Sequence, residues 1–137
     1  VRMALNAIDG MLAREHGQKS RMGAVLNELG DAVSDSALYL PFGRAPGINS
    51  WLVILVVVLA LLGELAGVVA VQIGTERRYD GPMGKSDRAM VFGILGLLLG
   101  LGVNAGSWTT TVLTAVAVLG VLTIVTRARR ALATGPA

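Results

Sequence analysis

The chain has 137 residues, which is enough for one domain. Hydrophobic residues make up 53% and charged residues only 15%, whereas a soluble domain carries about 25% charged residues. This composition indicates that lipid covers much of the surface. The net charge is +3 and aromatic residues make up 4%, which is too few for base-stacking platforms and argues against nucleic-acid binding. The absence of cysteine and the single histidine, His16, exclude thiolate and multi-histidine metal sites, so any metal must be held mainly by oxygen, which favours Mg²⁺, Mn²⁺ or Ca²⁺.

The first part of the chain predicts two helices. Residues 1–14 have the apolar pattern of the last turns of a helix, and residues 20–42 predict a second helix that Pro41 and the following turn residues terminate. The chain starts inside this pattern, without methionine or a signal peptide. We therefore expect one or more membrane segments upstream.

Two long apolar stretches follow. Residues 51–73 contain a single charge, Glu64, and are long enough to cross a bilayer core of about 30 Å, which needs roughly 20 residues. Residues 89–125 are too long for one crossing, and the polar and small residues at 104–107 interrupt them. This interruption predicts two helices joined by a tight turn.

Basic residues fall in three groups, which are Arg14, Lys19 and Arg21, then Arg77, Arg78, Lys85 and Arg88, and then Arg127, Arg129 and Arg130. If the predicted helices cross the membrane alternately, all three groups lie on one side. The opposite side receives Arg44 and an uncharged turn. By the positive-inside rule the side with the clusters is cytoplasmic.

Residues 6–31 combine small and oxygen-bearing residues at fixed spacing. The pattern resembles the signature of the CDP-alcohol phosphotransferase family, D-G-x2-A-R-x8-G-x3-D-x3-D, and covers roughly a fifth of the chain. Six of the seven specified positions match, at Asp9, Gly10, Ala13, Arg14, Gly23 and Asp31. The seventh is Asn27 where the family has aspartate. Asn6 stands where the family usually has a further aspartate.

The same residues are chemically consistent with such a site. Two neighbouring helices with these spacings would present four oxygen-bearing side chains across a gap, from Asn6, Asp9, Asn27 and Asp31. Carboxylates with amide oxygens suit a hard divalent cation. The residues that would leave room for a nucleotide diphosphate, or pair with it, are Gly10, Ala13, Gly23 and Arg14.

Asp35 creates a second possible register. Asn27, Asp31 and Asp35 are spaced four apart, which keeps them on nearly one face. In the family register Asn27 and Asp31 take the last two signature positions, whereas in the alternative Asp31 and Asp35 do. The first register is preferred because it also aligns Gly23 with the family glycine.

A second cluster spans residues 77–88, in a predicted cytoplasmic loop that leads into a helix start which Ser86 or Asp87 would cap. In the family, basic residues of this region help hold the acceptor alcohol, often a polyol phosphate. By this resemblance Lys85 and Arg88 would bind an acceptor phosphate. The alternative is a positive-inside loop that contacts lipid headgroups.

Glu64 lies roughly 13 Å inside its predicted span, at 1.5 Å per residue. A carboxyl group at this depth needs a partner or a proton. We predict a buried pair with Arg2, which lies on the face of Asp9. The alternative is a protonated Glu64 that is hydrogen-bonded to a neighbouring helix.

The predicted fold is all-α, a polytopic transmembrane bundle with one domain over residues 1–137, containing the end of one helix and four full spans. The resemblance implies a six-helix, commonly dimeric enzyme whose first helix and start of the second precede Val1. It also implies transfer of a substituted phosphate from a CDP-linked lipid donor to an alcohol or polyol-phosphate acceptor, with release of CMP, at the cytoplasmic face.

In this reaction Mg²⁺ or Mn²⁺ would neutralise the diphosphate, and Asp31, or Asp35 in the other register, would take the proton from the attacking hydroxyl. Two other classes stay open. One is a non-catalytic relative that binds nucleotide or lipid, which the two asparagines favour. The other is a small transporter, against which the ordered signature spacing argues.

Overall fold

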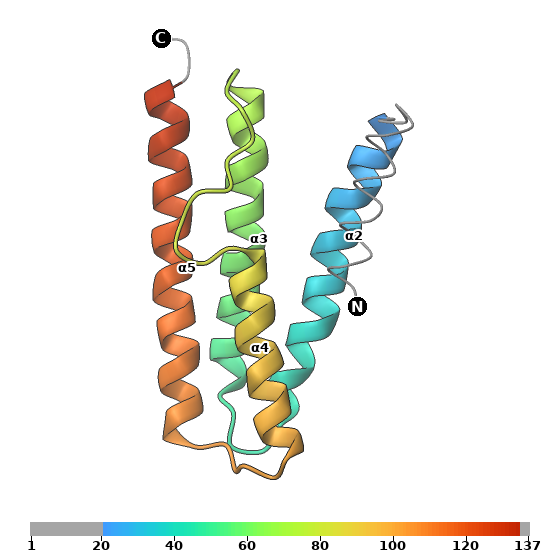
Figure 1. The fold of residues 1–137 in the computed structure, drawn as a ribbon, viewed down its shortest axis with the longest axis vertical. Coiled ribbons are helices and arrows are strands. Elements are labelled where there is room, and N and C mark those ends of the chain that lie inside the picture. The colour runs from blue at the N-terminus through green and yellow to red at the C-terminus, as the bar shows by residue number, and fades with distance from the viewer. Residues whose placement is uncertain (1–20, 135–137) are drawn as a thin grey trace. The chain divides into compact units, whose positions relative to one another are not determined.

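A computed structural model describes residues 21–134, and within this range every regular element is a helix. The elements are α2 (Arg21–Tyr39), the short 3-10 helix η1 (Leu40–Arg44), α3 (Ser50–Gln72), α4 (Lys85–Gly100) and α5 (Ser107–Thr134) (Figure 1). The all-α prediction is therefore confirmed, and the predicted helix over residues 1–14 lies outside the described residues. The chain divides into two compact units, Val1–Ser34 and Asp35–Ala137, which are described separately.

In the first unit, the described residues form the greater part of α2. The helix contains Gly23, Asn27 and Asp31 at intervals of four residues, so these positions share one face, as predicted. The helix gives way to η1 at Tyr39 because Pro41, near the start of η1, lacks a backbone N–H for a continuing ladder.

In the second unit, α3 is bounded by clear local signals. The Asn49 side chain caps its first turn by accepting hydrogen bonds from the backbone N–H groups of Trp51 and Leu52. At the other end Gly74 has φ +84°, and the N–H of Thr75 donates to the carbonyl of Ala70 at 3.1 Å. This is the glycine-terminated ending that satisfies the last carbonyls of a helix.

Helix α4 begins earlier than predicted, at Lys85. The residue before it, Gly84, is the N-cap, and its N–H donates to the Asp87 carboxylate at 2.8 Å. Asp87 therefore supports the helix start from within the first turn and is not itself the N-cap residue. The helix ends at Gly100, and Gly102, which has a positive φ, lies in the turn that follows. This turn confirms the predicted break between two helices, although it begins a few residues before the predicted interruption at 104–107.

Two described helices, α3 and α5, are long and apolar enough to cross a membrane, with mean hydropathy of 2.9 and 2.0. Helix α5 continues past the predicted end at residue 125 to Thr134, because its basic residues extend the helix beyond the apolar run. Helix α4 has 16 residues, about 24 Å at 1.5 Å per residue, which is short of a bilayer core of about 30 Å. Of the four full spans expected, only α3 and α5 meet this test among the described helices, and α2 and α4 do not.

The core of the second unit lies where α3 packs along α5, with α4 and η1 against them. Its fully buried large side chains are Leu95, Leu113, Val53, Val56, Thr109 and Thr123. Gly120 of α5 faces Leu59 of α3, where a Cβ would be in ordinary van der Waals contact at 3.5 Å from the Leu59 Cβ. Tyr39 stacks on Phe92 with ring centroids 4.3 Å apart and fixes the last turn of α2 against α4.

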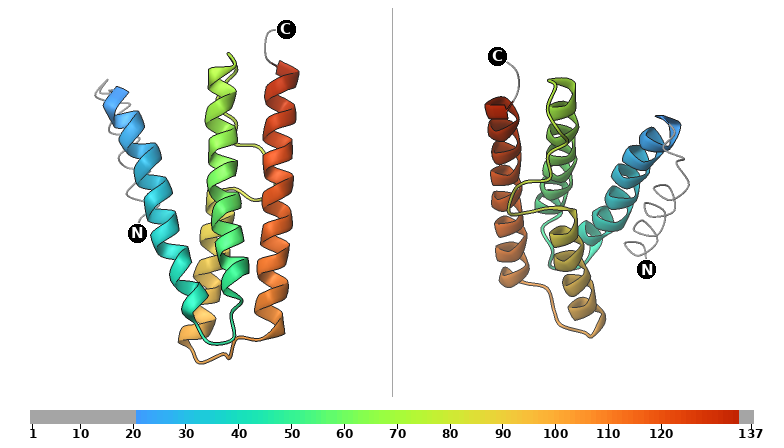
Figure 2. Two further views of the ribbon diagram at one scale, coloured as in Figure 1. Left: turned by 180° about the vertical axis from the view of Figure 1, so that it is seen from behind. Right: turned by 45° about the horizontal axis from the view of Figure 1, so that its top comes forward.

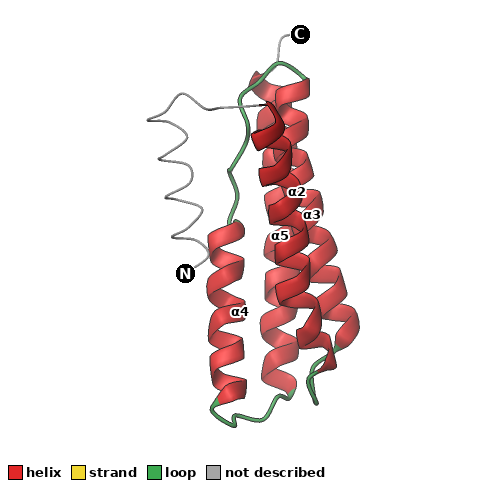
Figure 3. Ribbon diagram, turned by 90° about the vertical axis from the view of Figure 1, so that its right-hand side faces the viewer, coloured by secondary structure: helices red, strands yellow, loops and turns green. Residues whose placement is uncertain are grey.

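The connection from α3 to α4 turns back toward the middle of the helices. It leaves the end of α3, passes over to α5 and meets the start of α4 well short of the ends of both long helices (Figures 2 and 3). The backbone N–H of Arg78 donates to the carbonyl of Gly67 at 3.4 Å, so this loop runs back alongside α3. Arg78 of this loop contacts Arg130 and Thr134, so the loop and the basic end of α5 share one end of the unit. The short helix η1 (Leu40–Arg44) precedes the start of α3 at the other end.

Candidate functional site

The start of α4 holds a cluster of three arginines around one carboxylate. Glu64 of α3 receives Arg88 Nη2 at 3.3 Å and Arg127 Nη1 at 3.7 Å on Oε1, and Arg77 Nη2 lies 3.6 Å from Oε2. The arginines come from α4, α5 and the α3–α4 loop. We call these four residues the Glu64 cluster.

The members of the Glu64 cluster differ in burial. The Arg88 and Arg127 side chains are only 4% and 2% exposed, whereas those of Arg77 and Glu64 are 27% and 26% exposed. Glu64 lies eight residues before the end of α3, roughly 12 Å along the helix at 1.5 Å per residue. The cluster therefore has a buried floor and an accessible side.

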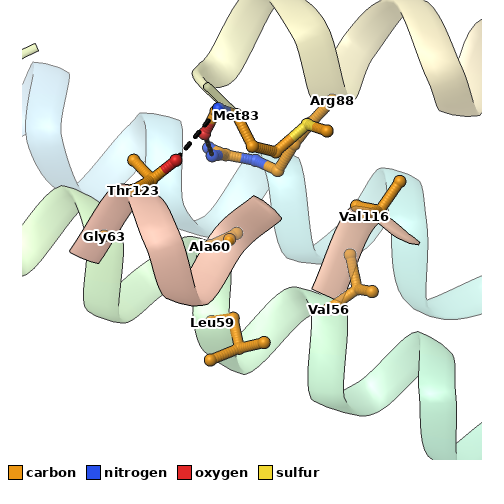
Figure 4. Close-up of a pocket in the computed structure, with 9 residues that line it drawn as sticks. Val56, Leu59, Ala60, Gly63, Met83, Arg88, Val116 and Thr123 are labelled. Carbon is orange, nitrogen blue, oxygen red and sulfur yellow. Dashed lines mark hydrogen bonds between the residues drawn. The ribbon is translucent and has the colours of Figure 1, made fainter. Parts of the chain in front are cut away.

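Arg88 connects the cluster to the end of α2. Its Nη2 lies 3.7 Å from Oδ2 of Asp35, which is itself buried. Its Nη1 donates to the Met83 carbonyl at 3.5 Å, and the Met83 N–H donates to Thr123 Oγ1 at 2.9 Å (Figure 4). Figure 4 shows this arrangement over a small pocket that Ala60 and Gly63 of α3 also line. Arg88 is thus held from α2, α3 and the loop before α4.

The α3–α4 loop is fixed by two glycines that leave no room for a side chain. A Cβ on Gly67 would lie 2.6 Å from the Arg78 carbonyl oxygen, and one on Gly81 would lie 2.8 Å from the Thr123 Cα. Gly81 also has φ +121°, a conformation that side chains rarely adopt. Close backbone packing at these two points returns the loop into the unit and brings Arg77 to Glu64.

Arg127 holds backbone as well as charge. Its Nη1 donates to the Gly63 carbonyl at 2.6 Å and its Nε donates to the Asp80 carbonyl at 3.0 Å. One guanidinium group therefore joins α5 to α3 and to the loop. Such multiple hydrogen bonding uses the planar, forked donor geometry of arginine.

A second carboxylate cluster lies on the outer side of the same loop. Asp80 accepts a hydrogen bond from Arg130 Nη1 at 2.6 Å and lies 3.9 Å from Arg78 Nη1. Arg78 also donates to the hydroxyl of Thr134 near the end of α5. We call Asp80, Arg78 and Arg130 the Asp80 cluster.

The charges of the Glu64 cluster indicate an anion site. The guanidinium groups of Arg77, Arg88 and Arg127 carry three positive charges, and Glu64 together with Asp35 carries two negative charges. Two of the three guanidinium groups, those of Arg88 and Arg127, lie where water is largely excluded. Arginine forks in such a setting bind carboxylate and phosphate groups well.

Only some of the residues predicted to bind the CDP-linked donor lie in the part of the chain that the structure describes. Asn6, Asp9, Gly10, Ala13 and Arg14 lie outside the described residues, as does Arg2. Gly23, Asn27 and Asp31 lie in α2, and Asp31 has a further hydrogen bond from Ser34 Oγ to its carbonyl at 3.2 Å. Whether the two halves of the signature meet therefore stays a prediction.

A divalent ion suits the signature residues that are described. Asn27 and Asp31 offer an amide and a carboxylate oxygen one turn apart on α2, and both are hard oxygen donors. Within residues 21–134 no group of three or more His, Cys, Asp or Glu side chains could hold a metal ion. The remaining ligands would have to come from the predicted positions 6 and 9.

The acceptor prediction falls on one member of the Glu64 cluster. Arg88 lies on the buried floor, and Lys85 lies half-buried one turn before it at the N-terminus of α4. The sequence pattern did not predict that Arg77 and Arg127 join this cluster. Arg127 comes just after the apolar run and was interpreted as part of the positive-inside signal. The signal that could have identified it is the need of Glu64, deep in its helix, for a nearby cation.

The predicted pair of Glu64 with Arg2 concerns a residue outside the described part of the chain. Within that part, Glu64 forms salt bridges with three arginines. The compensating charge that its depth demands is therefore supplied by α4, α5 and the loop.

Comparison with known proteins agrees with the signature. The family model described as CDP-alcohol phosphatidyltransferase matches residues 1–125. Inner membrane protein YnbA of Escherichia coli (strain K12) is 46% identical over 132 residues, which cover 96% of this chain and 66% of YnbA, so the chain spans just under two thirds of that relative. No solved structure matches the chain significantly. The chain is a membrane protein and belongs to the CDP-alcohol phosphatidyltransferase family.

Proposed function

We propose that the protein transfers a phosphatidyl-type group from a CDP-linked lipid to an alcohol acceptor and releases CMP, as a step of phospholipid biosynthesis. The observation that carries this proposal is the Glu64 cluster, a largely buried set of three arginines at the start of α4 in a chain of this family. Such a set suits an acceptor that carries a phosphate.

The donor half of the site would be formed by the signature. The oxygen ligands of a bound Mg²⁺ or Mn²⁺ would be Asn6, Asp9, Asn27 and Asp31. The bound ion would neutralise charge on the diphosphate. The small residues Gly10, Ala13 and Gly23 would let the nucleotide approach the backbone, and Arg14 would pair with a phosphate.

We assign the proton-accepting role to Asp31, in the family register. Asp35 lies 3.7 Å from Arg88 and is buried, so its carboxylate is held by a salt bridge and is poorly placed to take a proton from an incoming hydroxyl. In this scheme Asp35 is a positioning residue that orients Arg88.

The acceptor half would comprise Lys85 and Arg88, joined by Arg77 and Arg127. The helix N-terminus at Gly84 favours an anion there as well. The shared basic end of α5 and the α3–α4 loop supports a cytoplasmic orientation of this site by the positive-inside rule. A lipid tail would then stay in the bilayer while nucleotide and polyol phosphate stay in water. The homodimer implied by the family stays a prediction.

The test is CMP release by the full-length protein in lipid nanodiscs, supplied with CDP-diacylglycerol, a panel of polyol phosphates and neutral polyols, and Mg²⁺ or Mn²⁺. We expect metal-dependent release with a phosphorylated acceptor. Asp31→Asn should lower kcat by at least about 100-fold, the lower range for loss of a general base. Asp35→Asn should mainly raise the acceptor KM.

The matched control is Glu76→Gln, which changes an exposed carboxylate of the same end of the molecule. It should leave CMP release unchanged. Retained nucleotide binding with no CMP release from any acceptor would contradict the proposal and favour a non-catalytic relative, for which the asparagines at 6 and 27 are the physical reason.

A further inference from the structure

Glu64 occupies the position in which an anionic ligand of the three arginines would bind. Its two carboxylate oxygens lie within 3.3–3.7 Å of Arg77, Arg88 and Arg127. Charge-assisted hydrogen bonds between guanidinium and carboxylate groups are normally about 2.7–2.9 Å long. The Glu64 contacts are therefore long, and one of them, from Arg88, also has hydrogen-bond geometry.

The floor of the cluster has donor capacity that Glu64 does not use. The Nε of Arg88 is buried and has no hydrogen-bond partner among the described residues. A buried, unpaired donor is costly, and native proteins usually satisfy it with water or a ligand. A group with more acceptor oxygens than a carboxylate would satisfy this region better.

The carboxylate is also more accessible than two of its three partners. Glu64 is 26% exposed, whereas its partners Arg88 and Arg127 are 4% and 2% exposed and hold backbone carbonyls of Met83 and Gly63. Arg88 and Arg127 are thus fixed by contacts that do not involve Glu64. If the carboxylate turned away, they would stay in place as a preformed anion site.

We propose that Glu64 is an internal stand-in for the acceptor phosphate, which binds to Arg77, Arg88 and Arg127 by displacing the Glu64 carboxylate. This inference rests on the proposed function for the identity of the ligand. A phosphate monoester offers three acceptor oxygens and about two negative charges at neutral pH, against two oxygens and one charge for Glu64. Glu64 thereby becomes a specificity-determining residue, because a neutral alcohol cannot displace it.

The first experiment measures anion rescue. Full-length wild type and Glu64→Gln in phosphatidylcholine nanodiscs are unfolded by heat while inorganic phosphate is titrated. The Gln variant should unfold at a lower temperature without phosphate and recover as phosphate is added, because a ligand that binds only the folded state stabilises it. Its apparent phosphate affinity should exceed that of wild type by at least about tenfold, since one like charge at the site is removed.

The matched control is Asp80→Asn, which removes a carboxylate from the neighbouring Asp80 cluster and should show no phosphate rescue. If the Gln variant does not fold, Glu64→Asp keeps the charge but withdraws it by one methylene, and should bind phosphate more tightly than wild type. Phosphate affinity that is unchanged or weaker in both Glu64 variants would overturn the proposal. Stabilisation of Glu64→Gln by phosphatidylglycerol nanodiscs alone would also overturn it, in favour of a lipid headgroup.

A kinetic measurement separates this inference from the proposed function. In Glu64→Gln the KM for a polyol phosphate should fall severalfold relative to the KM for the CDP-linked donor. If wild type releases no CMP but phosphate still rescues Glu64→Gln, the catalytic proposal fails and the anion site stands. If wild type releases CMP and the KM ratio is unchanged, the stand-in role of Glu64 is wrong and the enzyme stands.

Discussion

The Glu64 and Asp80 clusters use the same chemical groups in different surroundings. Each has one carboxylate that faces arginines from α5 and from the loop region. The Asp80 cluster has the shorter contact, 2.6 Å to Arg130, but the Arg130 side chain is 60% exposed. The Glu64 contacts are 3.3–3.7 Å long, yet Arg88 and Arg127 are almost fully buried.

Because of this difference, contact length alone does not predict which cluster contributes more to the free energy of unfolding. Exposed ion pairs typically contribute about 0–1 kcal/mol because water and salt screen them. Removal of one partner from a buried pair costs roughly 3–5 kcal/mol, because an uncompensated charge is left in an apolar environment. The comparison therefore predicts that the Glu64 cluster, with its two buried arginines, contributes more to stability than the Asp80 cluster, whose closest cation is exposed.

Replacement of Glu64 by leucine should have the largest effect. It leaves Arg88 and Arg127 without their shared carboxylate, and the free energy of unfolding should fall by roughly 3–5 kcal/mol. The measurement is unfolding by sodium dodecyl sulfate titration in mixed micelles. Asp80→Leu is the matched control, and an equal loss in both variants would contradict the ranking.

Gly67→Ala should have the next largest effect. The added Cβ would lie 2.6 Å from the Arg78 carbonyl oxygen, so the loop must move off α3 and carry Arg77 away from Glu64. We expect a loss of about 1–3 kcal/mol from overpacking, with a higher acceptor KM. Gly93→Ala is the control because no neighbouring atom lies within 4 Å of its Cβ position. Gly93→Ala should be neutral or stabilising. A similar loss of stability in Gly93→Ala would show that the effect of Gly67→Ala does not come from its contact with the loop.

Thr123→Val tests the anchor of the loop below the Glu64 cluster. The valine removes the hydroxyl that accepts the Met83 N–H at 2.9 Å and leaves that buried donor unpaired. The cost should be about 1–2 kcal/mol in thermal unfolding. Thr114→Val, at an exposed position of the same helix, should change the Tm little. No difference between the two variants would show that the anchor contributes nothing to stability.

Asp80→Asn should have the smallest effect. Asp80 pairs with Arg130, whose side chain is 60% exposed, so the loss should stay below about 1 kcal/mol and shrink as salt is raised. Thermal unfolding at low and at 1 M NaCl measures this. A loss above that of Thr123→Val, or one that salt leaves unchanged, would mean that the Asp80 cluster is effectively buried and that the two clusters are alike.

Much of the fold was predictable because helices leave local signals. The apolar run, the Asn49 cap and Gly74 define α3 as Ser50–Gln72, against a prediction of residues 51–73. Gly102 and the polar turn after it define the break before α5. The early start of α4 was missed because its first turn is polar and charged, which resembles a loop in a hydropathy pattern.

The sequence by itself determined the helical membrane class, the basic end of the second unit and the alignment of Gly23, Asn27 and Asp31 on one helix face. Each follows from helical periodicity or composition, which depend only on neighbouring residues. The tertiary structure decided which cations surround Glu64. That choice depends on the loop returning along α3 through Gly67 and Gly81. The partner of a buried charge is set by which helices pack together, and helical spacing within one segment carries no information about that packing.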